Sequence, residues 1–340
     1  MTDKMYSIVI PCYQSSQTIG TVVEQTIKEM QKMNRGNLEF ILVNDCSPDD
    51  GATISVLRML AAQYSYVKVI DLAKNAGQHN AVMAGLRAAD GDVFISMDDD
   101  MQTRPSELHK MFVKFDEGYD VVYGAYPEKK EHVFRLIGSW VNKMCAVLFL
   151  GRPKNLRTSS YWIIRRYVRD SIISYQGAHS YLLGLILRAT SNITQVEVEH
   201  FKRTSGQSGY TLKSLLRLWS NMIGFTVKPL RAATYSGTAI AICSFLAAII
   251  LLIRKLAHPA LTAGWASMMI GVFFSMGVEL LFLGLIGEYI GRTYMHINSE
   301  PQYVIKAQYN MRDGNSNRGE KAEIKSSVMK NGQSNDYCRR

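Results

Sequence analysis

The sequence predicts an α/β protein with a parallel sheet that has helices on both faces. Two observations support this prediction. Apolar runs of strand length alternate with amphipathic stretches of helix length between residues 7 and 123, and polar or acidic residues follow directly after those runs. Such alternation is typical of βαβ units, whose strands are parallel. Sheets of this kind bind ligands beyond the carboxyl ends of their strands.

Each element follows from its apolar pattern and from the turn residues at its ends. The run 47–51 has the residues of a turn and a helix cap, Gly77 fits a turn before a helix, and Pro105 precedes another helix. The expected strands are 7–11, 38–44, 67–72, 92–97 and 121–123, and the expected helices are 19–33, 53–64, 78–88 and 106–117.

An acidic cluster directly after the strand 92–97 is the first candidate site. Asp98, Asp99 and Asp100 are followed by Met101 and Gln102. Oxygen ligands suit Mg²⁺ or Mn²⁺, and such sites often use one or two carboxylates while substrate phosphates complete the coordination. The alternative is a solvated acidic turn that leads into the next helix.

Polar residues also follow the other predicted strands. Tyr13 comes after the first strand, Asp45 after the second, and Lys74 and Gly77 after the third. Each of them alone fits an ordinary turn or helix cap. Because the carboxyl ends of parallel strands meet at one edge of a sheet, we expect these residues to converge with the acidic cluster on one crevice.

Two long apolar runs lie near the carboxyl end of the chain. No charged residue occurs in 232–253, and Glu279 is the only one in 259–287. Crossing a bilayer takes about 20 predominantly apolar residues. The runs therefore predict a transmembrane hairpin, with a buried core helix as the alternative. Residues 1–13 contain no apolar segment of signal-peptide length, so we expect the amino-terminal domain to stay in the cytoplasm.

The distribution of charge favours a membrane partner over a nucleic acid. The formal net charge is +10, and the segment 152–231 contains thirteen Lys or Arg residues against three acidic ones. A basic segment next to an apolar run is typical of a cytoplasmic flank that faces anionic lipid. The predicted crevice is acidic, which disfavours nucleic-acid binding.

Several motifs together resemble glycosyltransferase family 2, and in particular its polyprenyl-phosphate glycosyltransferases. The resemblance extends to about residue 305. Its motifs are Pro11-Cys12-Tyr13, Val43-Asn44-Asp45-Cys46-Ser47-Pro48-Asp49, Asn75-Ala76-Gly77-Gln78, Met97-Asp98-Asp99-Asp100-Met101-Gln102, the run 203–210 and the run 287–294.

The resemblance implies a GT-A (Rossmann-like) fold and a role for each motif. Pro11, Tyr13, Asp45, Lys74, Gly77 and Asp98 are expected to bind the donor nucleotide. The metal, Mg²⁺ or Mn²⁺, is expected at Asp98, Asp100 and Gln102, where it would neutralise charge on the leaving diphosphate. Asp99 occupies the variable middle position of the motif and is not expected to be a ligand.

The acceptor implied by the resemblance is a polyprenyl phosphate, which is already an anion near neutral pH. Arg135, Ser139, Arg203 and Ser205 are expected to hold this phosphate, and Arg135 and Arg203 are grouped with Asp100 as catalytic. Arg135 alternatively fits a snorkelling surface arginine, and the Gly- and Ser-rich run 202–210 fits a plain linker.

The expected organisation has four parts. Residues 1–209 form the GT-A domain, 210–231 an amphipathic juxtamembrane helix, 232–290 the hairpin with spans at about 232–254 and 263–290, and 291–340 a cytosolic tail. The tail is poor in large apolar residues and is expected to be disordered after about residue 305. The resemblance also implies a homo-oligomer, with a tetramer suspected.

The prediction is therefore an inverting, metal-dependent glycosyltransferase of the bacterial inner membrane, multi-pass, with its catalytic domain in the cytoplasm. Its donor would be a nucleotide sugar, with UDP favoured, and its acceptor undecaprenyl phosphate. The alternatives are a membrane-bound family-2 enzyme that acts on a glycan or protein, and a non-catalytic membrane scaffold with the same fold.

Overall fold

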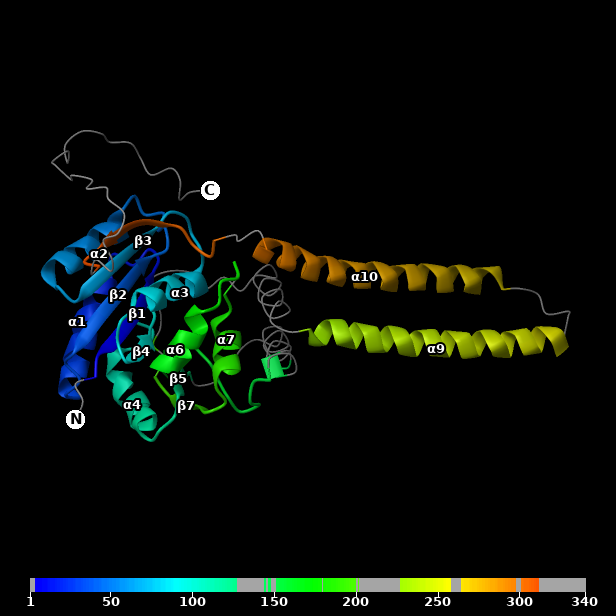
Figure 1. Ribbon diagram of the computed structural model, residues 1–340, viewed down its shortest axis with the longest axis horizontal. Coiled ribbons are helices and arrows are strands. Elements are labelled where there is room, and N and C mark those ends of the chain that lie inside the picture. The colour runs from blue at the N-terminus through cyan, green and yellow to red at the C-terminus, as the bar shows by residue number, and fades with distance from the viewer. Residues whose placement is uncertain are drawn as a thin grey trace. The chain divides into compact units, whose positions relative to one another are not determined.

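The chain divides into two compact units. In the computed structural model, the described residues are 4–126, 144, 146–147, 151–178, 180–199, 201, 227–257, 264–297 and 301–311. The first unit comprises residues 1–136, 152–209 and 301–340, and the second comprises 137–151 and 210–300. In its described part the first unit is the α/β domain, and the second contains two long helices (Figure 1).

An eight-stranded sheet forms the centre of the α/β domain, with the order β7-β5-β6-β4-β1-β2-β3-β8. The strands are β1 (Tyr6–Cys12), β2 (Leu38–Asn44), β3 (Val67–Leu72), β4 (Val93–Ser96), β5 (Val121–Ala125), β6 (Trp162–Arg165), β7 (Ile193–Glu197) and β8 (Ile305–Tyr309).

The sheet is mixed, so the expectation of an all-parallel sheet is wrong. The expected strands β1 to β4 pair in parallel, and β6 runs antiparallel to both β4 and β5, which places β5 in the same direction as β4. β8 runs antiparallel to β3 at one edge. Neither antiparallel strand was expected. Each pairs with a strand that is distant in the sequence, and local periodicity does not report such a pairing.

Helices cover both faces of the sheet. One face of the sheet carries α1, α2 and α4. The other face carries α3 and α6, and α7 packs beside α6. The helices are α1 (Ile19–Lys32), α2 (Ala52–Gln63), α3 (Gln78–Ala88), α4 (Leu108–Asp116) after the short 3₁₀ helix η1 (Pro105–Glu107), α6 (Arg166–Ile173) and α7 (Leu182–Ala189). Helices on both faces confirm the expected doubly wound arrangement.

The core follows the alternation of side chains along the strands. Ile8 and Ile10 of β1 belong to the main buried cluster, together with residues of α1, α2 and α4. Val9 points to the opposite face, where Gly85 of α3 lies so close that an added Cβ would be 2.4 Å from Val9 Cγ1. Gly85 therefore sets the distance between α3 and β1.

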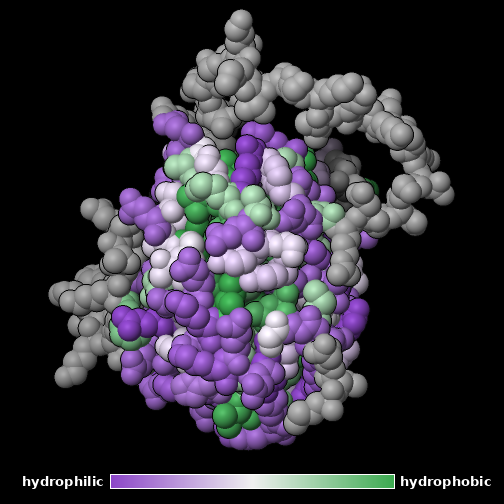
Figure 2. All heavy atoms as spheres, turned by 90° about the vertical axis from the view of Figure 1, so that its left-hand side faces the viewer, coloured by the Kyte–Doolittle hydropathy of each residue, from purple (hydrophilic) through white to green (hydrophobic). Residues whose placement is uncertain are grey.

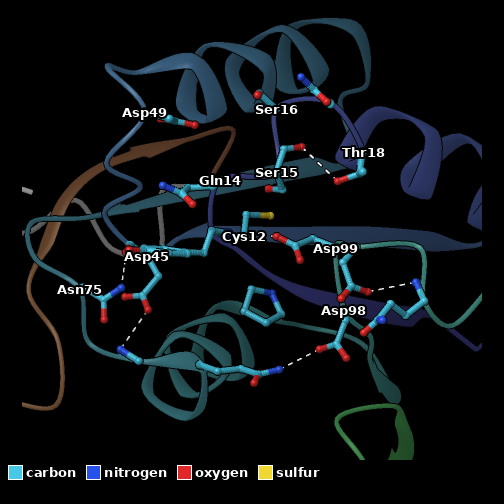
Figure 3. A pocket seen from close by; sticks show the side chains of 17 residues that line it. Cys12, Gln14, Ser15, Ser16, Thr18, Asp45, Asp49, Asn75, Asp98 and Asp99 are labelled. Atoms are coloured by element: carbon cyan, nitrogen blue, oxygen red, sulfur yellow. Dashed lines mark hydrogen bonds between the residues drawn. The ribbon is translucent and has the colours of Figure 1, made fainter. Parts of the chain in front are cut away.

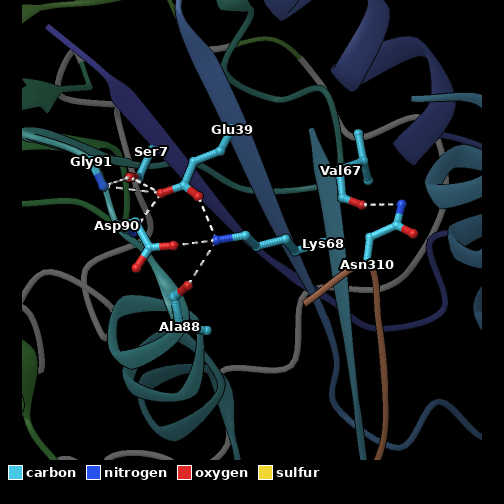
Figure 4. Close-up of polar contacts among 8 residues, drawn as sticks. All are labelled: Ser7, Glu39, Val67, Lys68, Ala88, Asp90, Gly91 and Asn310. Carbon is cyan, nitrogen blue, oxygen red and sulfur yellow. Dashed lines mark hydrogen bonds and ion pairs between the residues drawn. The ribbon is translucent and has the colours of Figure 1, made fainter. Parts of the chain in front are cut away.

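A buried network joins the amino ends of the central strands (Figure 4). Glu39 on β2 accepts hydrogen bonds from the hydroxyl of Ser7, from the N–H groups of Asp90 and Gly91, and from the ammonium of Lys68 at 2.7 Å. Lys68 also donates to Asp90 at 2.7 Å. Burial alone would lower the pKa of Lys68, but its hydrogen bonds to Asp90 and Glu39 and their charges raise it.

The segment 301–311 returns to the α/β domain, so the expectation of disorder after about residue 305 is wrong for β8. β8 pairs with β3, and the amide of Asn310 donates to the carbonyl of Val67 at 3.0 Å (Figure 4). The strand was missed because backbone pairing with the free edge of β3 stabilises it, whereas its own side chains are mostly exposed.

The second unit contains α9 (Lys228–Ala257) and α10 (Trp265–Ile297), which lie side by side (Figure 1). α9 contains the expected span at about 232–254, and α10 contains all but the first two residues of the expected span at about 263–290. Both helices expose large apolar side chains such as Phe245, Phe273 and Leu283. Within the described residues, one helical segment, Gly271–Gly291, is long and apolar enough to cross a membrane by length and composition. The face of the α/β domain in Figure 2 is by contrast largely hydrophilic.

Replacing Gly85 with alanine should destabilise the α/β domain by about 1–3 kcal/mol, because the new methyl group overpacks against the buried Val9. Gly20→Ala is the matched control, since an added Cβ there meets nothing within 4 Å and alanine favours the helix. Thermal unfolding followed by near-UV circular dichroism checks both variants. Equal stability of the two variants would contradict the close approach of α3 to β1.

Lys68→Met should cost about 3–5 kcal/mol of unfolding free energy, because it leaves Glu39 as a buried charge without its cation. The control is Lys32→Met, whose lysine is 69% exposed in its pair with Glu29, so the loss should stay below about 1 kcal/mol. Denaturant titrations of the full chain in detergent measure both losses. A small loss in Lys68→Met would mean that Glu39 finds another cation or takes up a proton.

Candidate functional site

An open pocket lies at the carboxyl ends of β1, β2 and β4 and beside the first turn of α3 (Figure 3). Its volume is about 810 Å³. The residues that line it are Pro11, Cys12, Tyr13, Gln14, Ser15, Ser16, Gln17, Thr18, Asp45, Asp49, Asn75, Gly77, Gln78, Asp98, Asp99, Asp100 and Gln102.

The pocket brings together most of the residues expected on the donor and metal side. Pro11, Tyr13, Asp45, Gly77, Asp98, Asp100 and Gln102 all line it. Lys74 is exposed and is absent from the described lining. The four residues expected on the acceptor side, Arg135, Ser139, Arg203 and Ser205, lie outside the described residues, as does most of the expected juxtamembrane helix 210–231.

Asp45 fixes the loop between β3 and α3. Its Oδ1 accepts the N–H of Ala76 at 2.6 Å, and its Oδ2 accepts the N–H of Gly77 at 2.9 Å. Gly77 has φ +84°, a conformation that glycine adopts without the strain of a Cβ. Burial raises the pKa of Asp45 to about 6, although the two N–H groups favour the ionised form. A nearly buried carboxylate thus lies at the pocket wall, bonded on both oxygens.

Asp98 is held from two sides at the end of β4. Its Oδ1 accepts the side-chain amide of Gln78 at 2.8 Å, and its Oδ2 accepts the hydroxyl of Ser160. Burial raises the pKa of Asp98 to about 6, the hydrogen bond from Ser160 opposes the rise, and the charges of Asp100 and Asp99 add to it. The two hydrogen bonds orient this carboxylate, while burial, and to a smaller extent the charges of Asp100 and Asp99, make its ionised form costly.

Asp99 is part of the pocket, although its middle position in the acidic cluster gave no reason to expect a metal ligand. Its Oδ2 accepts the N–H of Tyr13 at 2.9 Å, which joins the loop after β4 to the loop after β1. Burial raises the pKa of Asp99, and the N–H of Tyr13 lowers it. Tyr13 remains 48% exposed, so its side chain is accessible to a ligand.

The loop with Asp100 and Gln102 has a fixed backbone. Oδ1 of Asp100 accepts the N–H of Gln102 at 3.0 Å, and the carbonyl of Gln102 accepts the N–H of Phe201 at 2.9 Å. The guanidinium of Arg104 lies over the ring of Phe201, 3.8 Å from its centre. These contacts hold the acidic cluster against Phe201, the residue directly before the Gly- and Ser-rich run 202–210.

Backbone strain is concentrated in these loops. Within the described chain, the non-glycine residues with positive φ are Gln14, Asn34, Cys46, Asp50, Met101 and Asn310. Four of the six lie in the loops after β1, β2 and β4. Such conformations persist where the surrounding structure enforces them, and they are frequent at functional sites.

A chain of polar contacts links the end of β3 to the pocket. Asp71 accepts the amide of Asn44 at 2.7 Å, and the carbonyl oxygen of the same amide accepts the hydroxyl of Ser47 at 2.7 Å. Ser47 Oγ in turn accepts the N–H of Gln14 at 3.1 Å. The loops after β1 and β2 are therefore tied to β3, and a change at β3 can reach the pocket wall.

The sequence alone did not assign roles to Gln78, Ser160 or Asp99. Gln78 was part of a recognised motif, and its position as the first residue of α3 was the signal that it could reach the pocket. Ser160 lies 62 residues from the carboxylate that it contacts, and only the antiparallel pairing of β4 with β6 brings it there. No local pattern marks such a contact.

The donor set fits a divalent cation in part. Asp98, Asp100 and Gln102 all line one wall of the pocket and offer carboxylate and amide oxygens, the ligands that Mg²⁺ and Mn²⁺ prefer. Within the described residues, no group of three or more His, Cys, Asp or Glu side chains could hold a metal ion. In addition to the carboxylates of Asp98 and Asp100, a cation would therefore need the amide oxygen of Gln102, or oxygen atoms supplied by a bound ligand.

Comparison with known proteins gives consistent matches. The sequence model of the family described as Glycosyl transferase family 2 matches residues 7–172. An undecaprenyl-phosphate 4-deoxy-4-formamido-L-arabinose transferase from Proteus mirabilis (strain HI4320) is 30% identical over 317 residues, which cover 92% of this chain and 97% of that protein. The uncharacterized glycosyltransferase YkcC from Bacillus subtilis (strain 168) is 31% identical over 312 residues, which cover 89% of this chain and 94% of that protein.

A solved structure of glucosyl-3-phosphoglycerate synthase from Mycobacterium tuberculosis, in complex with Mn²⁺, UDP and glucosyl-3-phosphoglycerate, aligns with a TM-score of 0.47 and 20% identity, over 66% of this chain and 80% of that one. The family assignment rests on the two sequence relatives, which are 30% and 31% identical to this chain over most of its length and most of their own. The matched family region also contains every residue of the pocket lining. The chain belongs to glycosyl transferase family 2 and is a glycosyltransferase.

Proposed function

We propose that this protein transfers a sugar from a nucleotide sugar to undecaprenyl phosphate, or to a related polyprenyl phosphate, at the cytoplasmic face of a bacterial inner membrane. The proposal rests chiefly on one observation. The pocket gathers Asp45 and the cluster Asp98 to Asp100 at the strand ends, in a chain whose relatives named as undecaprenyl-phosphate transferases match over most of their length.

The donor nucleotide binds in the pocket, with UDP as the favoured nucleotide. The exposed ring of Tyr13 offers a surface on which a base can stack, and Pro11 lies next to it in the lining. Asp45 accepts hydrogen bonds from the base or the ribose in addition to those of Ala76 and Gly77, since each carboxylate oxygen has a second lone pair. Lys74 reaches the donor from outside the described lining.

The charge of the pocket supports metal dependence. Among the described lining residues, five are aspartates and none is Lys, Arg or His. A nucleoside diphosphate is itself an anion, so its binding next to these carboxylates requires a cation. Mg²⁺ or Mn²⁺ held by Asp98, Asp100 and Gln102 would neutralise the charge that develops on the leaving diphosphate.

The acceptor phosphate is the nucleophile. One of its oxygens attacks the anomeric carbon in line, the bond from that carbon to the nucleotide's β-phosphate oxygen breaks, and the configuration inverts. A phosphate monoester is an anion near neutral pH, so this step needs no general base. Arg135, Ser139, Arg203 and Ser205 hold the phosphate in this proposal, because guanidinium and hydroxyl groups suit a phosphate ligand.

The two long helices of the second unit support the proposed placement in a membrane. α9 and α10 expose apolar side chains along their lengths, and the segment 152–231 supplies the basic residues typical of a cytoplasmic flank. We propose that the two helices form a transmembrane hairpin and that the protein is a homo-oligomer in the membrane. This arrangement places a lipid acceptor and a water-soluble donor on the same enzyme.

The direct test incubates membranes that contain the protein with undecaprenyl phosphate and one UDP-sugar at a time, and identifies the lipid product by mass spectrometry. The proposal expects a polyprenyl-phosphate sugar from at least one donor, and none after EDTA. Sugar transfer only to protein or glycan would overturn the acceptor. Product formation that persists in EDTA would overturn the metal assignment.

Asp100→Ala should lower turnover by about 100-fold or more, because the loss of a metal ligand removes several kcal/mol of charge stabilisation in the transition state. The unfolding temperature should barely change, since Asp100 lies in an open pocket. Glu117→Ala is the matched control, because this carboxylate pairs with Lys114 at the surface outside the pocket. Turnover near that of the wild type in Asp100→Ala would remove Asp100 from the proposed metal site.

Asp45→Asn should weaken UDP binding by about tenfold, because the amide directs an NH₂ group at one of the two backbone N–H donors and loses a hydrogen bond to a charged group. The control is Asp116→Asn, the same chemical change at a carboxylate that is 56% exposed and bonded to Arg35. Calorimetric titration with UDP in the presence of Mn²⁺ measures both. Unchanged affinity in Asp45→Asn would show that the loop does not depend on this carboxylate.

A further inference from the structure

The segment 301–310 contacts two loops that support the donor pocket. Three residues separate it from the end of α10 in the sequence, and it belongs to the α/β unit. Gln302 is a buried polar residue with 7% exposure, which is unusual so close to a long exposed helix. The contacts that bury it connect the segment to the pocket from two directions.

The first connection runs along β3. β8 pairs with β3 from Val69 to Leu72, and the register shifts between Asp71 and Leu72. Beyond the strand, the N–H of Ala73 donates to the carbonyl of Val304 at 2.8 Å. Ala73 begins the loop whose N–H groups at Ala76 and Gly77 bind the carboxylate of Asp45. The pairing therefore fixes the start of the loop that holds Asp45.

The second connection runs through the loop between α6 and α7. The side-chain amide of Gln302 donates to the carbonyls of Tyr175 at 3.1 Å and Gly177 at 2.6 Å. Arg87 of α3 also donates to the carbonyl of Tyr175, at 2.8 Å, and its other nitrogen donates to the hydroxyl of Tyr303 at 3.1 Å. Gln302 and Arg87 thus hold the same loop from two elements.

This loop in turn holds the first turn of α3. Asn80 donates to the carbonyl of Ala178 at 3.2 Å, and its own carbonyl oxygen accepts the hydroxyl of Ser180 at 2.6 Å. The ring of Tyr181 packs edge to face on His79. The neighbouring residue Gln78 donates to Asp98. A displacement of the loop at Gln302 therefore propagates to the group that orients Asp98.

We propose that residues 301–310 form a clasp that positions Asp45 and Asp98 for the donor, and that Gln302 is its positioning residue. The inference rests on the proposed function in one respect, namely that the pocket binds a nucleotide. Because the clasp directly follows α10 in the sequence, it makes donor binding depend on the chain that leaves the proposed membrane hairpin. Gln302 acts through backbone carbonyls and does not touch the donor.

The test compares two anchors of the same clasp in the full chain. Gln302→Met keeps the side-chain length and removes both donated hydrogen bonds. Asn310→Ala removes the other anchor, which donates to the carbonyl of Val67 at the start of β3, at 3.0 Å, and to carbonyls at the end of α2, away from the pocket. For each variant the measurements are the affinity for UDP with Mn²⁺, the KM and kcat for the donor, the unfolding temperature and amide hydrogen exchange.

Gln302→Met should weaken UDP binding and raise the donor KM by about tenfold, as expected for the loss of two buried hydrogen bonds, with a smaller change in kcat. Its amide exchange should rise in 73–78 and 174–181. Asn310→Ala should lower the unfolding temperature, raise exchange in 61–69 and leave the donor KM within about twofold.

Equal donor KM values in the two variants, with equal losses of stability, would overturn the clasp and leave the segment as a structural edge. Loss of UDP affinity without added exchange in 73–78 or 174–181 would also overturn it. If the wild-type protein does not bind UDP, the proposed nucleotide fails instead, and the hydrogen-exchange comparison still shows whether Gln302 positions the two loops.

Discussion

The carboxylate of Glu39 is the contact on which the geometry of the α/β domain depends. It accepts hydrogen bonds from β1 through Ser7, from β3 through Lys68, and from the turn before β4 through the N–H groups of Asp90 and Gly91. A buried charge is costly unless all of its partners are present, so the network forms as a whole or not at all. It fixes the amino ends of the strands whose carboxyl ends lead to Tyr13, Asp45 and Asp98. The relative placement of these three residues therefore depends on a contact at the opposite ends of the same strands.

The pocket concentrates negative charge and then holds it in place. Backbone N–H groups bind Asp45 and Asp99, while side-chain donors bind Asp98, so the carboxylates are oriented although burial raises their pKa values. Such a site is costly to fold and has a strong demand for a cation. In the proposed function this arrangement favours binding of an anionic diphosphate together with a divalent cation, which would neutralise both the carboxylates and the leaving group. The strained loops around the pocket agree with a site whose geometry is enforced by its surroundings.

The α/β domain is discontinuous in sequence. It is completed by β8, which follows the long helices α9 and α10, and the segment adds polar anchors at Gln302 and Asn310 to the backbone pairing. Although its side chains are mostly exposed, β8 covers the free edge of β3, which would otherwise be open to pairing with other chains. The same segment links the residues after α10 to the loop after β3, which lines the pocket, and to the loop between α6 and α7. The proposed membrane hairpin and the completed α/β domain are therefore joined by one short segment of the chain.

The sequence by itself determined the strands β1 to β5, the helices α1 to α4 and the strand ends where Tyr13, Asp45 and Asp98 lie, because local apolar periodicity and turn residues encode these elements. It also identified the two long apolar helices from their length. Only the tertiary structure decided that β6 and β8 make the sheet mixed, that Ser160 orients Asp98, that Asp99 joins two loops, and that Gln302 supports the pocket. The three side-chain contacts join residues that are 62 to 125 positions apart in the sequence. The mixed pairing depends on the arrangement of the whole sheet. A periodic pattern reports which face of an element is buried, whereas pairing direction and side-chain partners depend on which distant segment comes to lie beside it.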